Sequence, residues 1–491
     1  MLDRIFKLGK EAAIYGLSSI VGRFLNFLLV PFLTNYLLKA ELGVYSYVYS
    51  YIAFAFVLYG YGMDSAYMRF AASAEAGDKK VKVSVPFLSL LATSLALSSL
   101  ITLYATGISE VLGIGAGNAH LVRYSAWILC FDTLAIVPFA YLRMENRAKL
   151  FAGLRVFNIV INVILTIVAL VVLDLKLESL FIANLVASGV TAIALLVVVF
   201  PLLTLRFPGR LYREMLGFGL PYIPAGLAGI AIQVIDRPIL KALTDNDTVG
   251  VYQAGYRLGV LMMLVVGMFD YAWRPFFLTH AKDEDAPKLF SKVFTYFVGF
   301  MMLVFVIGSL FVDDIARIRV FGGYFIGPKF WGGLSIVPIV LLAYVFTGAY
   351  VNFVVGVYLE KKTKYLPYAT GAGALVNVGA NFLLIPKMGI TGAAIATLLS
   401  YVVMAAGIYF PSQRLYHVQY EWSRVARLFF IGVGVVLVFL ALNLQPMEGT
   451  SLLIKLALTV LFIVLVFILR VFDSADIRET KTALLKMFGR S

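Results

Sequence analysis

The amino-acid sequence predicts an all-α membrane protein whose chain crosses the bilayer many times. Of the 491 residues, 61% are hydrophobic and only 14% are charged, and the mean hydropathy is +0.92. Soluble domains carry about 25% charged residues, so this composition excludes an ordinary soluble enzyme. Apolar runs of the roughly 20 residues that a bilayer requires recur about fourteen times along the chain.

The predicted spans follow one another with short connections, which leave no room for a soluble catalytic domain. Prolines inside four of them predict helix kinks, at Pro31, Pro138, Pro224 and Pro338. The external loop over 313–330 is basic, which indicates either a short surface helix or a misplaced span boundary. In chain order the predicted spans are 12–37, 42–69, 83–106, 119–142, 150–173, 178–203, 215–240, 249–275, 288–312, 331–359, 364–386, 389–411, 422–443 and 450–471.

Internal repeats divide these spans into two pseudo-symmetric lobes of six helices and a final pair. The run Leu42–Tyr45 at the start of the second span resembles Val249–Tyr252 at the start of the eighth. An even number of spans in each lobe predicts parallel repeats, an arrangement typical of alternating-access transporters. Two asparagines four residues apart also recur, as Asn158 and Asn162 in span five and as Asn377 and Asn381 in span eleven. The predicted parts are an N-terminal lobe over 1–205, a cytoplasmic linker over 206–214, a C-terminal lobe over 215–411, and the last two spans with a cytoplasmic tail over 412–491.

Lysine and arginine predict the orientation. They gather in the loops on the side of the N-terminus, for example at Lys79–Lys82 and Lys361–Lys364. The positive-inside rule therefore places both termini in the cytoplasm of a multi-pass protein of the cytoplasmic (inner) membrane. The net charge of +14 has the same origin and does not indicate a nucleic-acid partner.

Arg23 is the residue around which we expect a binding site. It lies roughly 13 Å into a hydrocarbon layer about 30 Å thick, where leaving it against lipid costs about 3 kcal/mol. Its side chain should therefore face protein or a watery cavity, together with Ser19 and Asn26 on the same helical face.

Two further arginines in predicted spans, Arg257 in span eight and Arg237 in span seven, join Arg23 as candidates for binding a diphosphate. Arginine presents a forked set of donors that matches phosphate oxygens. A salt bridge to the adjacent Asp236 is an equally good interpretation of Arg237. Gln233 and Tyr256 are candidate cavity-lining residues from the same two spans.

Carboxylates within or at the ends of spans are candidates for gating or ion coupling. Those of Asp64 and Asp270 occupy matching places in spans two and eight, where a latch with Arg69 or Arg274 is favoured over an ion site. The complete set is Asp64, Asp132, Asp236 and Asp270.

No cofactor or metal is predicted, and we assign no catalytic residue. The single cysteine, Cys130, excludes a thiolate cage, and the three histidines lack the spacing of metal ligands. No carboxylate pair has the context of a hydrolase.

Several short motifs occur along the chain: the asparagine pair of span eleven and the runs Ala40–Tyr45, Gly62–Phe70, Leu384–Pro386 and Gly392–Thr397. Together they resemble the polysaccharide transporter branch of the multidrug/oligosaccharidyl-lipid/polysaccharide exporter superfamily, which includes O-antigen and exopolysaccharide flippases.

The resemblance implies translocation of undecaprenyl-diphosphate-linked oligosaccharides from the inner to the outer leaflet. Related peptidoglycan-precursor flippases place an arginine of the first helix at the diphosphate. Arg23 matches that place, and Arg257 is the candidate from the second lobe. The partners implied are the lipid-linked substrate, membrane lipids, and a polysaccharide polymerase with its chain-length machinery. A multidrug or small-cation antiporter and a lipid II flippase remain as alternatives. The antiporter should prefer acidic cavity residues, and a membrane glycosyltransferase or polymerase should have a large external loop.

Overall fold

The predicted all-α membrane class is confirmed by the structure. The computed structural model describes residues 16, 20–72 and 78–471. Within them, twelve helices are long and apolar enough to cross a membrane, and the bent pair α11 (Gly209–Gly219) and α12 (Tyr222–Val234) is a thirteenth candidate. The apolar helix Ile20–Tyr36 is the described part of the predicted first span.

The first half of the chain forms helices that match the predicted spans two to six to within a few residues. Its described elements are α2 (Val30–Tyr36), α3 (Lys39–Gly60), α4 (Met63–Ala72), α5 (Lys79–Leu103), α6 (Ala105–Val111), η2 (Ala116–Asn118), α7 (Ala119–Leu134), α8 (Ile136–Met144), α9 (Ala148–Ile167), the π-helix η3 (Val168–Val172), α10 (Lys176–Val199) and η4 (Phe200–Leu202).

The second half begins inside the predicted linker, since α11 starts at residue 209. After α11 and α12 it comprises α13 (Asp236–Leu243), α14 (Asn246–His280), α15 (Ala286–Arg317), β1 (Arg319–Val320), β2 (Gly323–Tyr324), η5 (Pro328–Ile336), α16 (Val337–Phe353), α17 (Val355–Leu359), α18 (Tyr365–Met388) and α19 (Ile390–Leu415), followed by α20 (Trp422–Leu442) and α21 (Gly449–Ile468).

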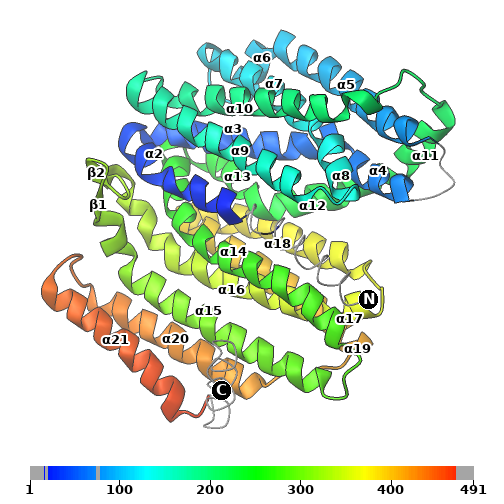
Figure 1. Ribbon diagram of the computed structural model, residues 1–491. Helices are drawn as coiled ribbons and strands as arrows, with labels where there is room; N and C mark the ends of the chain where they lie inside the picture. Colours follow the sequence, from blue (N-terminus) through cyan, green and yellow to red (C-terminus); the bar gives the residue numbers. More distant parts are fainter. Residues whose placement is uncertain (1–15, 17–19, 73–77, 472–491) are drawn as a thin grey trace.

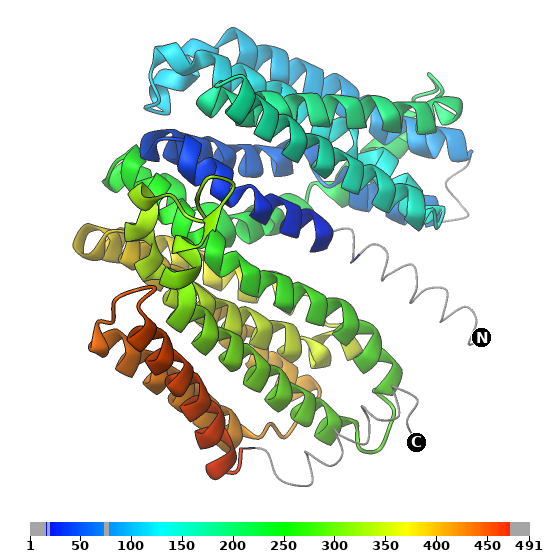
Figure 2. The same ribbon diagram turned by 60° about the vertical axis from the view of Figure 1, so that its left-hand side comes forward.

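The two halves meet where α3 and α14 cross. Helices α5, α6, α7 and α10 lie at the top of Figure 1, α15, α20 and α21 lie at the bottom, and α3 and α14 lie between them (Figures 1 and 2). At the crossing, a Cβ atom on Gly43 would stand 1.8 Å from the carbonyl oxygen of Asn246, and one on Gly250 would stand 2.0 Å from that of Lys39. Only glycine permits this backbone contact, so the repeated Leu42–Tyr45 and Val249–Tyr252 runs mark the contact between the halves.

A β-hairpin closes the same end of the molecule. The region 313–330 is neither a surface α-helix nor a separate span, because α15 continues to residue 317 and β1 then pairs with β2 in antiparallel register. Asn35 of α2 donates from Nδ2 to the carbonyl oxygen of Tyr324 at 2.6 Å. The backbone N–H of Gly327 donates to Thr34 Oγ1 at 3.0 Å. These bonds join the first helix to the second half.

Three of the four predicted proline kinks coincide with helix breaks, and one is displaced. Breaks precede Pro31, Pro138 and Pro338, where α2, α8 and α16 begin. Pro224 lies within the first turn of α12, where a missing N–H costs no helical bond, and the 40° bend lies between α11 and α12 at residues 220–221.

The last two helices pack on the outside of α15 (Figure 1). Lys455 of α21, 1% exposed, donates to Asp314 Oδ2 of α15 at 2.5 Å. The backbone N–H of Met447 donates to the other carboxylate oxygen at 2.8 Å. A buried charge pair thus fixes α21 to the second half.

Candidate functional site

Arg23 and Arg257, one from each half, line the same cavity. It has a volume of about 410 Å³ and lies beside the crossing of α3 and α14. Arg23 belongs to the helix over residues 20–28, and Arg257 lies on α14, two turns beyond Gly250. The polar residues that share the cavity are Asn26, Tyr45, Tyr49, Asn158, Asn162 and Asn184.

Neither guanidinium group forms an ion pair with a carboxylate among the residues that the structure describes. The Arg257 guanidinium lies 5.7 Å from the centre of the Tyr45 ring and makes a cation–π contact with it. Arg23 is exposed to the cavity, and its Nη1 lies 3.6 Å from the place of a Cβ on Gly267 of α14. Two guanidinium groups that lack a carboxylate partner among the described residues give the cavity a positive charge, which is electrostatically suited to an anionic group.

A second cavity of about 410 Å³ extends from Arg23 along α14, away from the end at which the β-hairpin lies. Asp270 and Arg274 line it. They form an ion pair of 2.7 Å within their own helix, so Arg274 neutralises the carboxylate locally. Arg23 is therefore the residue common to both cavities.

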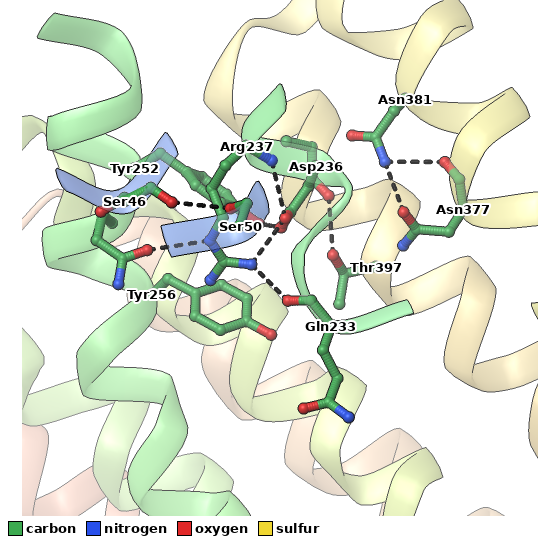
Figure 3. Close-up of polar contacts among 12 residues, drawn as sticks. Ser46, Ser50, Gln233, Asp236, Arg237, Tyr252, Tyr256, Asn377, Asn381 and Thr397 are labelled. Carbon is green, nitrogen blue, oxygen red and sulfur yellow. Dashed lines mark hydrogen bonds and ion pairs between the residues drawn. The ribbon is translucent and has the colours of Figure 1, made fainter. Parts of the chain in front are cut away.

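Arg237 lies apart from these cavities. It is 6% exposed, and its Nη1 donates to Asp236 Oδ1 at 2.7 Å and to the backbone oxygen of Gln233 at 2.5 Å (Figure 3). Its guanidinium lies 4.5 Å from the centre of the Tyr256 ring, and Tyr252 donates a hydrogen bond to the other oxygen of Asp236. In this structure Arg237 therefore forms the salt bridge with Asp236 that was one of its two interpretations.

The same contacts place three other candidates in a polar cluster of the second half. Tyr256 is buried, and its hydroxyl lies 3.2 Å from that of Tyr344. The side chain of Gln233 is exposed and donates to the carbonyl oxygen of Gly229 at 3.3 Å. Asp236 has both carboxylate oxygens engaged, so the cluster is internally neutral in charge. None of the three lines the cavity that Arg23 and Arg257 share.

The repeated asparagines of α18 lie next to this cluster (Figure 3). Asn381 donates from Nδ2 to the backbone and side-chain oxygens of Asn377 at 2.8 and 2.9 Å, and Thr397 donates to the carbonyl oxygen of Ala393. Within the described residues, Asn377 Nδ2 and Asn381 Oδ1 are buried without a partner. Over the same residues, no group of three or more His, Cys, Asp or Glu side chains is arranged to hold a metal ion.

Asp64 and Asp132 line a third cavity, of about 920 Å³, which lies between helices of the first half and α12. Asp64 accepts a hydrogen bond from Ser65 at 3.4 Å, and Arg69 lies over the ring of Phe218 at 4.5 Å. In the described part of the chain, no ion pair joins Asp64 or Arg69 to the second half. The predicted latch between the halves is not formed by these residues and stays a prediction.

The sequence-based site was incomplete. Ser19 lies outside the described residues, whereas Asn26 lines the cavity as expected. Arg155 was missed because its place near the start of span five resembles that of an interfacial cation. The available signal was its spacing from Asn158 and Asn162, which puts the three side chains on one face of α9.

Two halves of membrane helices around a shared cationic cavity are the architecture of the multidrug/oligosaccharidyl-lipid/polysaccharide exporter fold. A family model described as "Polysaccharide biosynthesis protein" matches residues 8–281, and the chain belongs to this family. Comparison with curated protein sequences gave no match.

Solved structures show the same fold at low sequence identity. The chain is similar to the lipid II flippase MurJ in an inward closed conformation, with a TM-score of 0.74 and 15% identity over 93% of this chain and 99% of that one. An inward-facing multidrug resistance transporter of the MATE family has a TM-score of 0.61 and 17% identity, covering 85% of this chain and 99% of its own. The Vibrio cholerae MATE transporter VcmN has a TM-score of 0.57 and 13% identity, covering 84% and 97%.

Proposed function

We propose that this protein is a flippase that moves undecaprenyl-diphosphate-linked oligosaccharide units across the cytoplasmic membrane by alternating access. The observation that carries the proposal is the pairing of Arg23 and Arg257. The two cations come from different halves, share one cavity, and have no carboxylate partner among the described residues. A diphosphate that enters this cavity supplies the missing negative charge and bridges the halves.

The family supports the same conclusion. A polysaccharide biosynthesis protein with a transporter fold has the task of delivering lipid-linked glycans to the outer leaflet, for O-antigen or another surface polysaccharide. Its product then passes to a polymerase and chain-length machinery. The distribution of lysine and arginine supports an orientation with both termini in the cytoplasm. In that orientation the hairpin and the α3–α14 crossing lie on the outer side.

Substituting each arginine by alanine and by lysine tests the role of the cavity. We expect Arg23→Ala and Arg257→Ala to abolish glycan display at matched protein level. If lysine fails as well, forked recognition of phosphate is required in addition to charge. Arg210→Ala is the matched control, because Arg210 is an exposed arginine that pairs with Glu214 on the surface of α11. Normal display from both alanine variants would overturn the proposal.

A lipid II flippase is the second candidate, and the fold similarity to MurJ favours it. Both cargoes carry the same diphosphate, so the arginine variants alone do not separate them. Expression in cells depleted of their own lipid II flippase does. Restored growth would favour lipid II, whereas restored display of surface glycan in cells lacking a polysaccharide flippase favours the proposal. An antiporter of small cations is disfavoured by two uncompensated arginines in the cavity.

A further inference from the structure

The third cavity adjoins the arginine cavity, because Tyr49, Asn158 and Asn184 line both. The third cavity runs from Tyr49 of α3 to Asp64 at the start of α4, between helices of the first half and α12. Its volume of about 920 Å³ is at the upper end of the roughly 300–1,000 Å³ of small-molecule sites and holds more than one sugar ring.

Polar side chains on two adjacent helices form one wall of this third cavity. Asn158 on α9 donates from Nδ2 to Thr191 Oγ1 of α10 at 2.8 Å. Asn184 on α10 donates from Nδ2 to the Tyr49 hydroxyl at 2.8 Å and accepts from Ser188 at 3.3 Å. Asn158 Nδ2 also donates to the Ala187 carbonyl oxygen at 3.0 Å, so the network fixes both asparagines at the cavity wall, as a site for hydrogen-bonded recognition requires.

The third cavity is lined by equal numbers of acidic and basic side chains. Asp64 and Asp132 are the acidic ones, and Arg143 and Arg155 are the basic ones. The Arg155 guanidinium lies 4.8 Å from the centre of the Phe139 ring. Carboxylates accept hydrogen bonds from hydroxyl groups, and guanidinium groups donate to hydroxyl and ring oxygens. The set therefore suits a ligand that is rich in hydroxyl groups and uncharged. A cationic drug would need a net negative charge, whereas the apolar residues that also line the cavity, such as Phe56 and Phe139, can pack against the faces of sugar rings.

The second half has no equivalent opening at its copy of the asparagine motif. Asn377 and Asn381 are both 0% exposed, whereas Asn158 and Asn162 line the cavities of the first half. Helices α12 and α13 pack against α18 in the second half. The two copies of one sequence motif thus have different environments, and only the copy in the first half can touch a ligand.

We propose that the third cavity is a glycan subsite, which binds the neutral sugars next to the diphosphate. This inference rests on the proposed function. With the diphosphate between Arg23 and Arg257, the first sugars extend past Asn158 and Asn184 toward Arg155. The third cavity therefore selects the glycan, while the pair of arginines selects the diphosphate.

Binding by the full-length protein in nanodiscs tests the subsite. The probes are bare undecaprenyl diphosphate and undecaprenyl diphosphate carrying a neutral hexose trisaccharide. Ala225 of α12 lines the third cavity and is exposed, so Ala225→Trp fills the space without removing a hydrogen bond. Arg155→Gln is a second variant, which removes a donor. Ala96→Trp is the matched control, because Ala96 is exposed on α5 and lines none of the described cavities.

We expect the wild-type protein and Ala96→Trp to bind the glycosylated lipid at least about tenfold more tightly than bare undecaprenyl diphosphate, the equivalent of one or two net hydrogen bonds. In Ala225→Trp and Arg155→Gln this preference should be lost, with binding of the bare lipid unchanged. Equal wild-type affinity for both lipids would overturn the subsite, as would a parallel loss for both lipids in the two variants. If Arg23→Ala and Arg257→Ala bind both lipids normally, the proposed function fails instead.

Discussion

Replacing Asn35 by alanine tests whether the contact between α2 and the β-hairpin holds one end of the two halves together. Asn35 makes two hydrogen bonds across the halves. It donates from Nδ2 to the Tyr324 carbonyl oxygen at 2.6 Å, and it accepts from the Tyr324 backbone N–H at 3.3 Å. Gly323 leaves the space that this side chain occupies, since a Cβ there would lie 2.6 Å from Asn35 Oδ1.

The size of the effect follows from these two bonds. Each contributes about 0.5–1.5 kcal/mol net, so their loss amounts to about 1–3 kcal/mol. These bonds must break when the halves separate at this end. Their free energy therefore stabilises only the state that is closed at the hairpin end. Asn35→Ala should therefore shift the equilibrium between the two states by about 5–150-fold toward the state that is open at the hairpin end.

Spin labels at Leu173 and Leu243 report this shift as a distance distribution. Both side chains are exposed, one on each half, and the neighbouring residues Asp174 and Asn246 line one surface cavity at this end. We expect Asn35→Ala to enlarge the longer-distance population. Asn118→Ala is the control, because it removes a 2.6 Å bond to Ile114 that lies within the first half. Identical distributions for Asn35→Ala, the control and the wild-type protein would refute the reasoning.

Three further predictions concern the contact between the halves, the last helices and the topology. Gly250→Leu should abolish glycan display without preventing membrane insertion, because a Cβ there would lie 3.1 Å from the backbone nitrogen of Gly43 and closer still to a carbonyl oxygen; normal display would contradict this. Asp314→Asn should lower the free energy of unfolding by about 3–5 kcal/mol by leaving Lys455 buried and unpaired, and replacing both residues by apolar ones should restore the thermal midpoint. A cysteine placed at Lys80 should resist external labelling in intact cells, and labelling from outside would reverse the orientation.

The sequence predicted the membrane spans well because hydrocarbon imposes a length and a composition on every helix. The predicted limits of span five, 150–173, correspond to the helix over 148–172. The breaks were harder to place. The bend at residues 220–221 was assigned to Pro224, because hydropathy does not distinguish a proline in the first turn of a helix from one in its interior.

The candidate site was predicted in part. The depth of Arg23 and Arg257 was enough to indicate that both face a cavity, because few other places can hold a buried cation. For Arg237 the same reasoning could not decide between a binding role and a salt bridge. The Asp236–Arg237 pair is held by Tyr252 and Gln253, which approach it only when α13 and α14 pack together. Arg155 was not predicted, although it lines the third cavity, because its position near the start of span five is typical of an interfacial cation.

The two ends of the halves are held by different sets of contacts. At the hairpin end, backbone approach at Gly43 and Gly250 holds α3 against α14. At the other end α4 lies against α11, where a Cβ on Gly62 would stand 2.3 Å from the carbonyl oxygen of Gly219 and Arg69 lies over the Phe218 ring. Asp270 pairs there with Arg274 of its own helix, and among the described residues Asp64 has no ion-pair partner in the second half. A contact biases two states only when it differs between them. Under the proposed function, an anionic cargo binds at Arg23 and Arg257 between these two sets of contacts, and Asp64 and Asp270 are the charged groups whose pairing we expect to differ between the states.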